Sequence, residues 1–137
     1  LTLGAEGILM GTRFMASREC PLHPKVKQLL LQTGETDTMI IERSIKNASR
    51  VIKTDFARKV LAMEEKGATL DELFPLITGK RAKQVYANGD INDSTLFCGQ
   101  VTGLLDDAPT VKEIIKGIVD EAEQVMGRLK RMGISIQ

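Results

Sequence analysis

The segment Gly7–Phe14, which reads Gly-Ile-Leu-Met-Gly-Thr-Arg-Phe, constrains the fold of this chain more than any other stretch. Its apolar run predicts a buried strand. The glycine that follows allows a tight backbone and a close approach to a ligand. Thr12 adds a hydroxyl beside freed backbone N–H groups, which can hold a phosphate. Because Gly-Thr after a strand is more often a simple turn, the motif alone leaves phosphate binding as one of two interpretations.

The residues before this segment predict that earlier strands precede the chain. Leu1–Gly4 has the pattern of a last helical turn closed by a glycine, and Glu6-Gly7 forms a short link to the strand. Parallel strands are normally buried between neighbouring strands and covered by helices. We therefore expect residues 1–14 to belong to the last strand-and-helix unit of a larger sheet.

Composition indicates a soluble globular chain without a nucleic-acid or membrane partner. The 137 residues carry a net charge of +1, so no strong field attracts nucleic acid or an anionic membrane. No apolar run approaches the length of a membrane-spanning helix. Cys20 and Cys98 are far apart and form no CxxC pattern. We expect two reduced thiols and a cytoplasmic location.

Periodicity and capping signals predict a mostly helical chain after His23. The predicted helices are 24–33, 54–66, 69 to about 79, a short one closed by Asn88-Gly89, 95–105, and one that starts at Pro109 and carries an apolar face to Leu129. Residues 36–41 are predicted to be extended, and the stretch through Ile45 and Val51 is ambiguous between strand and helix. We expect the apolar face of the last helix to be structural core and Asp106 and Asp107 to cap its start.

Catalytic chemistry is hard to find in the residues themselves. His23 is the only histidine, so no histidine-based metal cluster can form, and no metal site is predicted. Its place between Pro21 and Pro24 favours a structural loop residue over a general base. Composition and spacing alone indicate a helix-rich piece of an α/β protein with a candidate phosphate loop.

Four segments resemble the nitronate monooxygenase family, formerly called 2-nitropropane dioxygenases. Leu3–Phe14 resembles the last barrel strand and phosphate loop of that family. Arg18–Lys27, Gln84–Asp90 and Gly99–Asp107 resemble later stretches in the same order and with fitting spacing. The resemblance covers nearly the whole chain and is specific at the superfamily level.

The resemblance implies an α/β fold that is the C-terminal fragment of a TIM (β/α)8 barrel, itself mostly α-helical with one N-terminal barrel strand. A complete barrel needs roughly 250 residues, so much of it must lie outside this chain. Residues 1–35 would hold the last barrel unit with the phosphate loop. Residues 36–108 would form a helical insertion on the substrate side, and residues 109–137 an amphipathic helix that packs on the barrel.

The resemblance also implies FMN as the cofactor. Its phosphate would be held by the backbone around Leu9, Met10, Gly11 and Thr12. The family usually has Gln or Asn where this chain has Leu9. A backbone contact to the phosphate would survive that change, and a side-chain contact would not.

No catalytic residue is assigned to this chain, because the family's catalytic base is a histidine on an upstream strand. That role is not transferred to His23. We expect Tyr86 and Lys83 to lie on the substrate side, although a packing role for Tyr86 is the alternative.

The leading functional hypothesis is an FMN-dependent oxidoreductase, specifically a nitronate monooxygenase that oxidises alkyl nitronates with O₂. The same pattern also resembles NADH:quinone reductases and flavin-dependent enoyl-acyl-carrier-protein reductases. The expected partners are a small-molecule substrate and the remainder of the same polypeptide, without which this part is inactive; the oligomeric state stays open. A hypothesis from another class is a non-catalytic helical module that binds a partner protein through Val111–Leu129.

Overall fold

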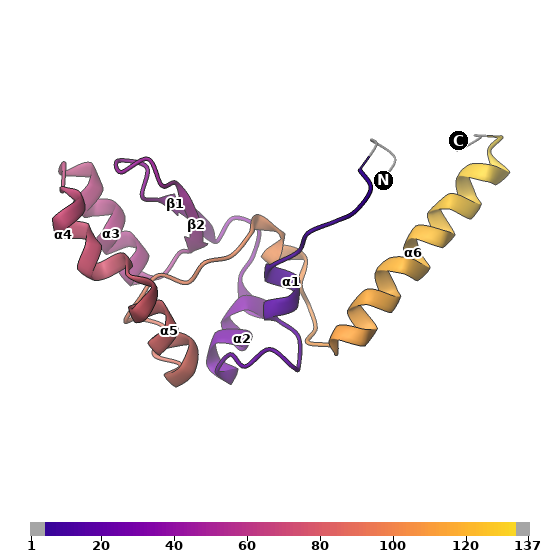
Figure 1. Cartoon of the computed structure of the whole chain (residues 1–137), viewed down its shortest axis with the longest axis horizontal. Coiled ribbons are helices and arrows are strands. Elements are labelled where there is room, and N and C mark those ends of the chain that lie inside the picture. The colour runs from indigo at the N-terminus through magenta and orange to yellow at the C-terminus, as the bar shows by residue number, and fades with distance from the viewer. Residues whose placement is uncertain (1–4, 134–137) are drawn as a thin grey trace.

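The computed structural model describes residues 5–133, so the predicted helix end at Leu1–Gly4 lies outside the described part. Helices dominate the architecture (Figure 1). In chain order the elements are α1 Thr12–Met15, α2 Pro24–Gln32, β1 Thr38–Ile41, β2 Ser49–Ile52, α3 Asp55–Glu65, α4 Leu70–Ile77, α5 Gly79–Asn88, the 3₁₀ helix η1 Gln100–Leu104, and α6 Val111–Arg131.

Local capping signals account for the helix boundaries. Thr54 caps α3 by accepting a hydrogen bond from the Ala57 N–H, and Thr69 forms a capping box with Glu72 at the start of α4. His23 caps α2 through its ring Nδ1, with Pro24 at the first helical position. The predicted helices at 24–33, 54–66 and 69–79 and the helix end at Asn88-Gly89 are confirmed.

A β-hairpin and one adjoining segment form the centre of the structure. The strands β1 and β2 pair antiparallel, with Met39 opposite Val51. Residues 96–98 then lie beside β2, because Ile52 N–H donates to Leu96 O and Cys98 N–H donates to Arg50 O. The ambiguous stretch through Val51 is therefore resolved as a turn followed by a strand.

The predicted helix over residues 95–105 is wrong. The backbone of residues 96–98 forms hydrogen bonds with β2 and is therefore not available to a helix. Only Gln100–Leu104 forms a short 3₁₀ helix. Gly99 has extended backbone, and Gly103 packs so closely on the Glu35 backbone that a Cβ there would lie 2.3 Å from the Glu35 nitrogen. Gly103 thus serves close packing in a backbone that is not α-helical.

Two groups of buried side chains meet at this central segment. One group joins α2, β2 and α5 through Val26, Leu30, Ile52, Val85, Leu96 and Cys98. The other joins the hairpin to α3 and α4 through Ile41, Val51, Phe56, Ala57, Val60 and Leu73. The side chain of Phe97 packs against this second group, while its neighbours Leu96 and Cys98 belong to the first.

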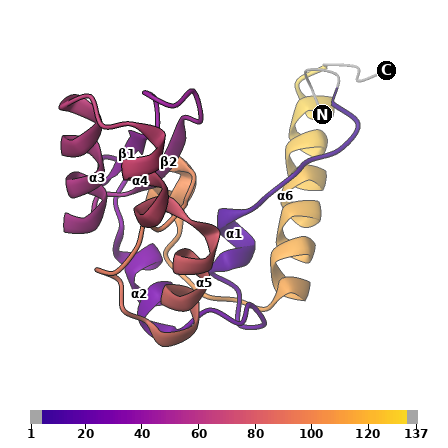
Figure 2. The same ribbon diagram turned by 60° about the vertical axis from the view of Figure 1, so that its left-hand side comes forward.

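Helix α6 extends away from the rest of the described chain (Figures 1 and 2). Of its apolar face only Ile114 is buried, while Ile115, Val119 and Met126 are exposed. Within residues 5–133 most of this face is therefore not buried. Packing on the rest of a barrel stays a prediction.

The start of α6 also differs from expectation. Thr110 is the N-cap and forms a capping box with Glu113, a Thr-x-x-Glu signal that the sequence carried. Asp107 pairs with Arg13 through a 2.6 Å contact between its Oδ1 and the guanidinium. The capping role expected of Asp106 and Asp107 was therefore wrong.

Residues 7–10 do not form a strand in the described structure. A strand needs the N–H and C=O groups of a neighbour, and the strands within residues 5–133 pair only with each other and with Phe97. Ile8 and Leu9 are 62% and 101% exposed. The segment has no regular secondary structure and leads into α1 (Figure 1).

We expect substitution of Gly89 to test the packing of α5 on the loop before α2. Gly89 has a φ of 77°, and a Cβ there would lie 2.1 Å from His23 Nδ1. Gly67 has a φ of 82° with open space around it, so Gly67→Ala adds only left-handed strain of about 1–2 kcal/mol. Gly89→Ala should lower the free energy of unfolding by about 1 kcal/mol more than Gly67→Ala in urea titrations. Equal losses would contradict the His23–Gly89 contact.

Candidate functional site

The candidate phosphate loop turns directly into a short helix. Gly11 is the N-cap of α1, and no side chain caps the helix. The Met15 N–H donates to Gly11 O in the first hydrogen bond of the helix. The backbone N–H groups that come before Met15 in this turn therefore have no acceptor within the helix. No atom of the described residues outside the immediate chain neighbours lies within 4 Å of a Cβ built on Gly11. The loop therefore presents open backbone with donors that point out of the helix start.

Thr12 makes a contact that its position in the motif did not predict. The residue is 8% exposed, and its Oγ1 accepts a 2.8 Å hydrogen bond from the Gly99 N–H. Gly99 directly follows the segment that lies beside β2. The hydroxyl thus ties the loop to the centre of the structure and fixes the loop backbone.

Charged residues after Thr12 hold the loop against the start of α6. Arg13 contacts the Asp107 carboxylate at 2.6 Å and its carbonyl at 3.2 Å. The Arg18 N–H donates to Pro109 O at 3.0 Å, and Glu19 accepts from the Val111 N–H. The sequence did not single out these contacts, because they join residues more than ninety positions apart.

The other predicted loop residues differ in exposure. Leu9 projects fully into solvent, while Met10 is half-buried. Met10 and Arg13 line a cavity of about 800 Å³ together with Leu104, Ile114 and Ile118. The loop, η1 and α6 thus surround one hollow beside the candidate phosphate site.

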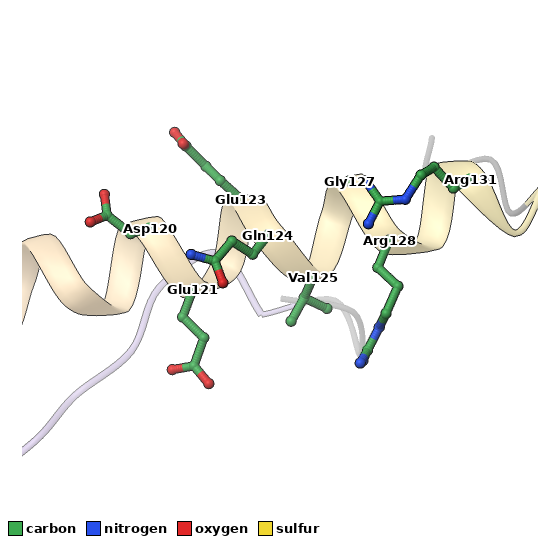
Figure 3. Close-up of a pocket in the computed structure, with 8 residues that line it drawn as sticks. All are labelled: Asp120, Glu121, Glu123, Gln124, Val125, Gly127, Arg128 and Arg131. Carbon is green, nitrogen blue, oxygen red and sulfur yellow. The ribbon is translucent and has the colours of Figure 1, made fainter.

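A second hollow of about 800 Å³ lies along α6 alone (Figure 3). Its acidic residues Asp120 and Glu123 and its basic residues Arg128 and Arg131 all come from one helix. Polar groups that converge from several elements are typical of a ligand site. Since all the polar groups of this hollow come from one helix, it is not a candidate site.

Tyr86 and Lys83 lie on α5, one helical turn apart. Tyr86 packs against the buried group that contains Val85 and Leu96, and Met15 of α1 packs against the same group. Burial raises the pKa of Tyr86, while a hydrogen bond with the Phe97 backbone lowers it. Lys83 is exposed. Tyr86 therefore has a packing role, and substrate contact by either residue stays a prediction.

The remaining titratable candidates are structural. The His23 side chain caps α2, and its backbone N–H donates to Tyr86 O at 2.8 Å, which confirms the structural role. Cys98 is buried, and burial raises the pKa of its thiol to about 11, so it is inert at neutral pH. Within residues 5–133 no group of three or more His, Cys, Asp or Glu could hold a metal ion. No helix in that range has the length and apolar character that a membrane crossing requires.

Comparison with known proteins yields one matching family model and several relatives. The model described as nitronate monooxygenase matches residues 1–121. A Rhodococcus jostii protein, (3aS,4S,5R,7aS)-5-hydroxy-7a-methyl-1-oxo-octahydro-1H-indene-4-carboxyl-CoA dehydrogenase, is 29% identical over 89% of this chain and 45% of its own length. A Staphylococcus saprophyticus protein named "Probable nitronate monooxygenase" is 28% identical over 93% of this chain and 36% of its own.

Solved structures of FabK from Thermotoga maritima also match. One superposes with a TM-score of 0.86 at 32% identity, over 95% of this chain and 41% of FabK. The chain thus spans less than half the length of each of these relatives.

Substitution of Thr12 tests the link between the loop and the central segment. Thr12→Val keeps the shape but leaves the Gly99 N–H without its acceptor, which costs about 1–3 kcal/mol when the group is buried. Thr12→Ser keeps the hydroxyl and should lose less. Urea unfolding of both variants measures the difference. A Thr12→Val protein as stable as Thr12→Ser would show that this hydrogen bond does not hold the loop.

Proposed function

The chain belongs to the nitronate monooxygenase family, and we propose that it supplies the phosphate end of the FMN site in an FMN-dependent oxidoreductase. The family is one of flavin-dependent oxidoreductases, and the expected fold class, part of an α/β TIM barrel that is itself mostly helical, is confirmed. The activity of the whole protein is proposed, since the chain spans only part of its relatives.

The open first turn of α1 is the observation that carries this proposal. A phosphate accepts hydrogen bonds from backbone N–H groups at a helix start, and Gly11 leaves room for it to approach. The Thr12 oxygen accepts a hydrogen bond from Gly99, which fixes the residue, and within the described residues its O–H stays free as a donor beside the backbone N–H groups. The residues therefore fit a phosphate through backbone N–H groups at Gly11 and Thr12, and this is how we assign the contact.

The departure at Leu9 agrees with a backbone contact. The side chain points into solvent and offers no hydrogen-bonding group. Met10 would contribute its backbone in the same way. Arg13 lies next to the proposed phosphate, but its guanidinium is held by Asp107. We assign Arg13 the task of orienting the loop.

We further propose that the reaction is oxidation of an alkyl nitronate by O₂. Support comes from the family description and from relatives that carry the nitronate monooxygenase name. FMN, when bound, supplies the electron transfer, and the protein holds and orients it. His23 is placed as a helix cap and is not offered as a base.

A second candidate is a reductase or dehydrogenase that acts on a thioester. The Rhodococcus jostii relative, at 29% identity, is named as a carboxyl-CoA dehydrogenase, and the Staphylococcus saprophyticus nitronate monooxygenase is 28% identical. Identity of this order does not discriminate between substrates, because one fold hosts many chemistries.

Flavin retention tests the phosphate loop. Gly11→Val places a branched side chain where the phosphate would approach, so the purified holoprotein should carry less FMN per chain. Gly7→Val is the matched control, because Gly7 also has open space around it but precedes the proposed contact. Absorbance of bound flavin relative to protein gives the occupancy. Full occupancy in Gly11→Val would refute the assignment of this loop.

Anaerobic reduction tests the reaction class. An alkyl nitronate added without O₂ should bleach the visible absorbance of the bound flavin, and NADH should bleach it slowly. Readmission of O₂ should restore the absorbance. Rapid bleaching by NADH, followed by turnover on an enoyl thioester or a quinone, would select the reductase alternative instead.

A further inference from the structure

A buried carboxylate with one unused oxygen lies at the turn of the β-hairpin. Glu42 is 2% exposed and follows β1 directly. Its Oε2 accepts hydrogen bonds from Asn47 and Ser49, which close the turn. Its Oε1 is buried and has no hydrogen-bond partner. A buried polar atom without a partner is costly, so Oε1 is available to accept a further hydrogen bond.

A second carboxylate makes this place more negative. Glu64 of α3 accepts a 2.7 Å hydrogen bond from the Glu42 N–H and further bonds from Ser44. Burial raises the pKa of Glu42, and the charge of Glu64 raises it further. Arg43 and Lys46 of the same turn are exposed, and within residues 5–133 no ion pair joins either glutamate to a cation.

The unused oxygen belongs to a residue that lines a cavity with largely apolar walls. The cavity measures about 400 Å³ and lies between the hairpin turn and α4. Ile45, Leu70, Phe74 and Ile77 provide the apolar lining. Phe74 is 59% exposed, so its ring is free to cover a ligand. Volumes of this size and mixed linings are typical of small-molecule sites.

We propose that this cavity binds a primary alkylammonium ion. The ammonium group would donate to Glu42 Oε1, and the alkyl chain would lie against Phe74 and Leu70. The two carboxylates favour a cation, and the apolar wall favours an organic one over a hydrated metal ion. The site stands apart from the phosphate loop and does not depend on FMN.

The hairpin turn itself does not need the second oxygen. Asn47 and Ser49 both bond to Oε2, and Asn47 N–H also donates to the Glu42 carbonyl at 3.0 Å. Glu42 has a φ of 63°, a left-handed conformation that is uncommon for a residue with a side chain. The turn therefore keeps its shape without any contact to Oε1.

Titration with n-hexylammonium chloride tests the proposal on the whole protein. Amide shifts in NMR spectra should change at residues of the hairpin turn and α4 and saturate. 1-Hexanol, which has the same chain without the charge, should bind at least about tenfold more weakly. Glu42→Gln should weaken hexylammonium by at least about tenfold and leave hexanol unchanged, while Phe74→Ala should weaken both.

Glu65→Gln is the matched control, because Glu65 is an exposed glutamate of α3 that does not line the cavity. It should bind hexylammonium as the unchanged protein does. Absence of saturable shifts, or equal binding of hexylammonium by Glu42→Gln, would overturn the proposal. A structure of the whole protein in which one of its own lysine or arginine side chains fills the cavity would also overturn the proposal. Thermal melting of each variant confirms that it is folded, and Phe74→Ala provides a test that leaves the hairpin intact.

Discussion

The structure depends on the backbone pairing of residues 96–98 with β2. This short segment lies beside β2 as a third extended stretch next to the two-stranded hairpin. Leu96 and Cys98 enter one buried group and Phe97 packs on the other, so the two halves of the core meet here. The next residue, Gly99, donates to Thr12 and thereby fixes the candidate phosphate loop. A change in this pairing would therefore reach both the core and the loop.

Short sequence patterns predicted the helix boundaries, because contacts between residues close in sequence form the helix caps. Thr54 accepts a hydrogen bond from the first turn of α3, Thr69 donates to Glu72 in the first turn of α4, and Gly89 closes α5 in a left-handed conformation. Such contacts join residues a few positions apart, and short-range patterns reveal them. The pairing of Leu96 with Ile52 joins distant residues, and the composition around Gly99 and Gly103 fitted a weak helix equally well.

The site was predictable to a similar degree. The apolar run followed by Gly11 and Thr12 predicts a phosphate loop, which stays a prediction, while the partner of the Thr12 hydroxyl lies 87 positions away and has no sequence signal. The ion pair between Arg13 and Asp107 was hidden for the same reason. Residues 7–10 were expected to be a barrel strand, but a strand's hydrogen bonds require neighbouring strands, and the described residues place none beside them.

A crystal structure of the FMN-loaded protein tests the central claim most directly. The account predicts that the FMN phosphate lies within hydrogen-bonding distance of the backbone N–H groups of Gly11 and Thr12, with Thr12 Oγ1 still bonded to Gly99. An FMN phosphate bound at another part of the protein, with the start of α1 facing only solvent or protein, would contradict it.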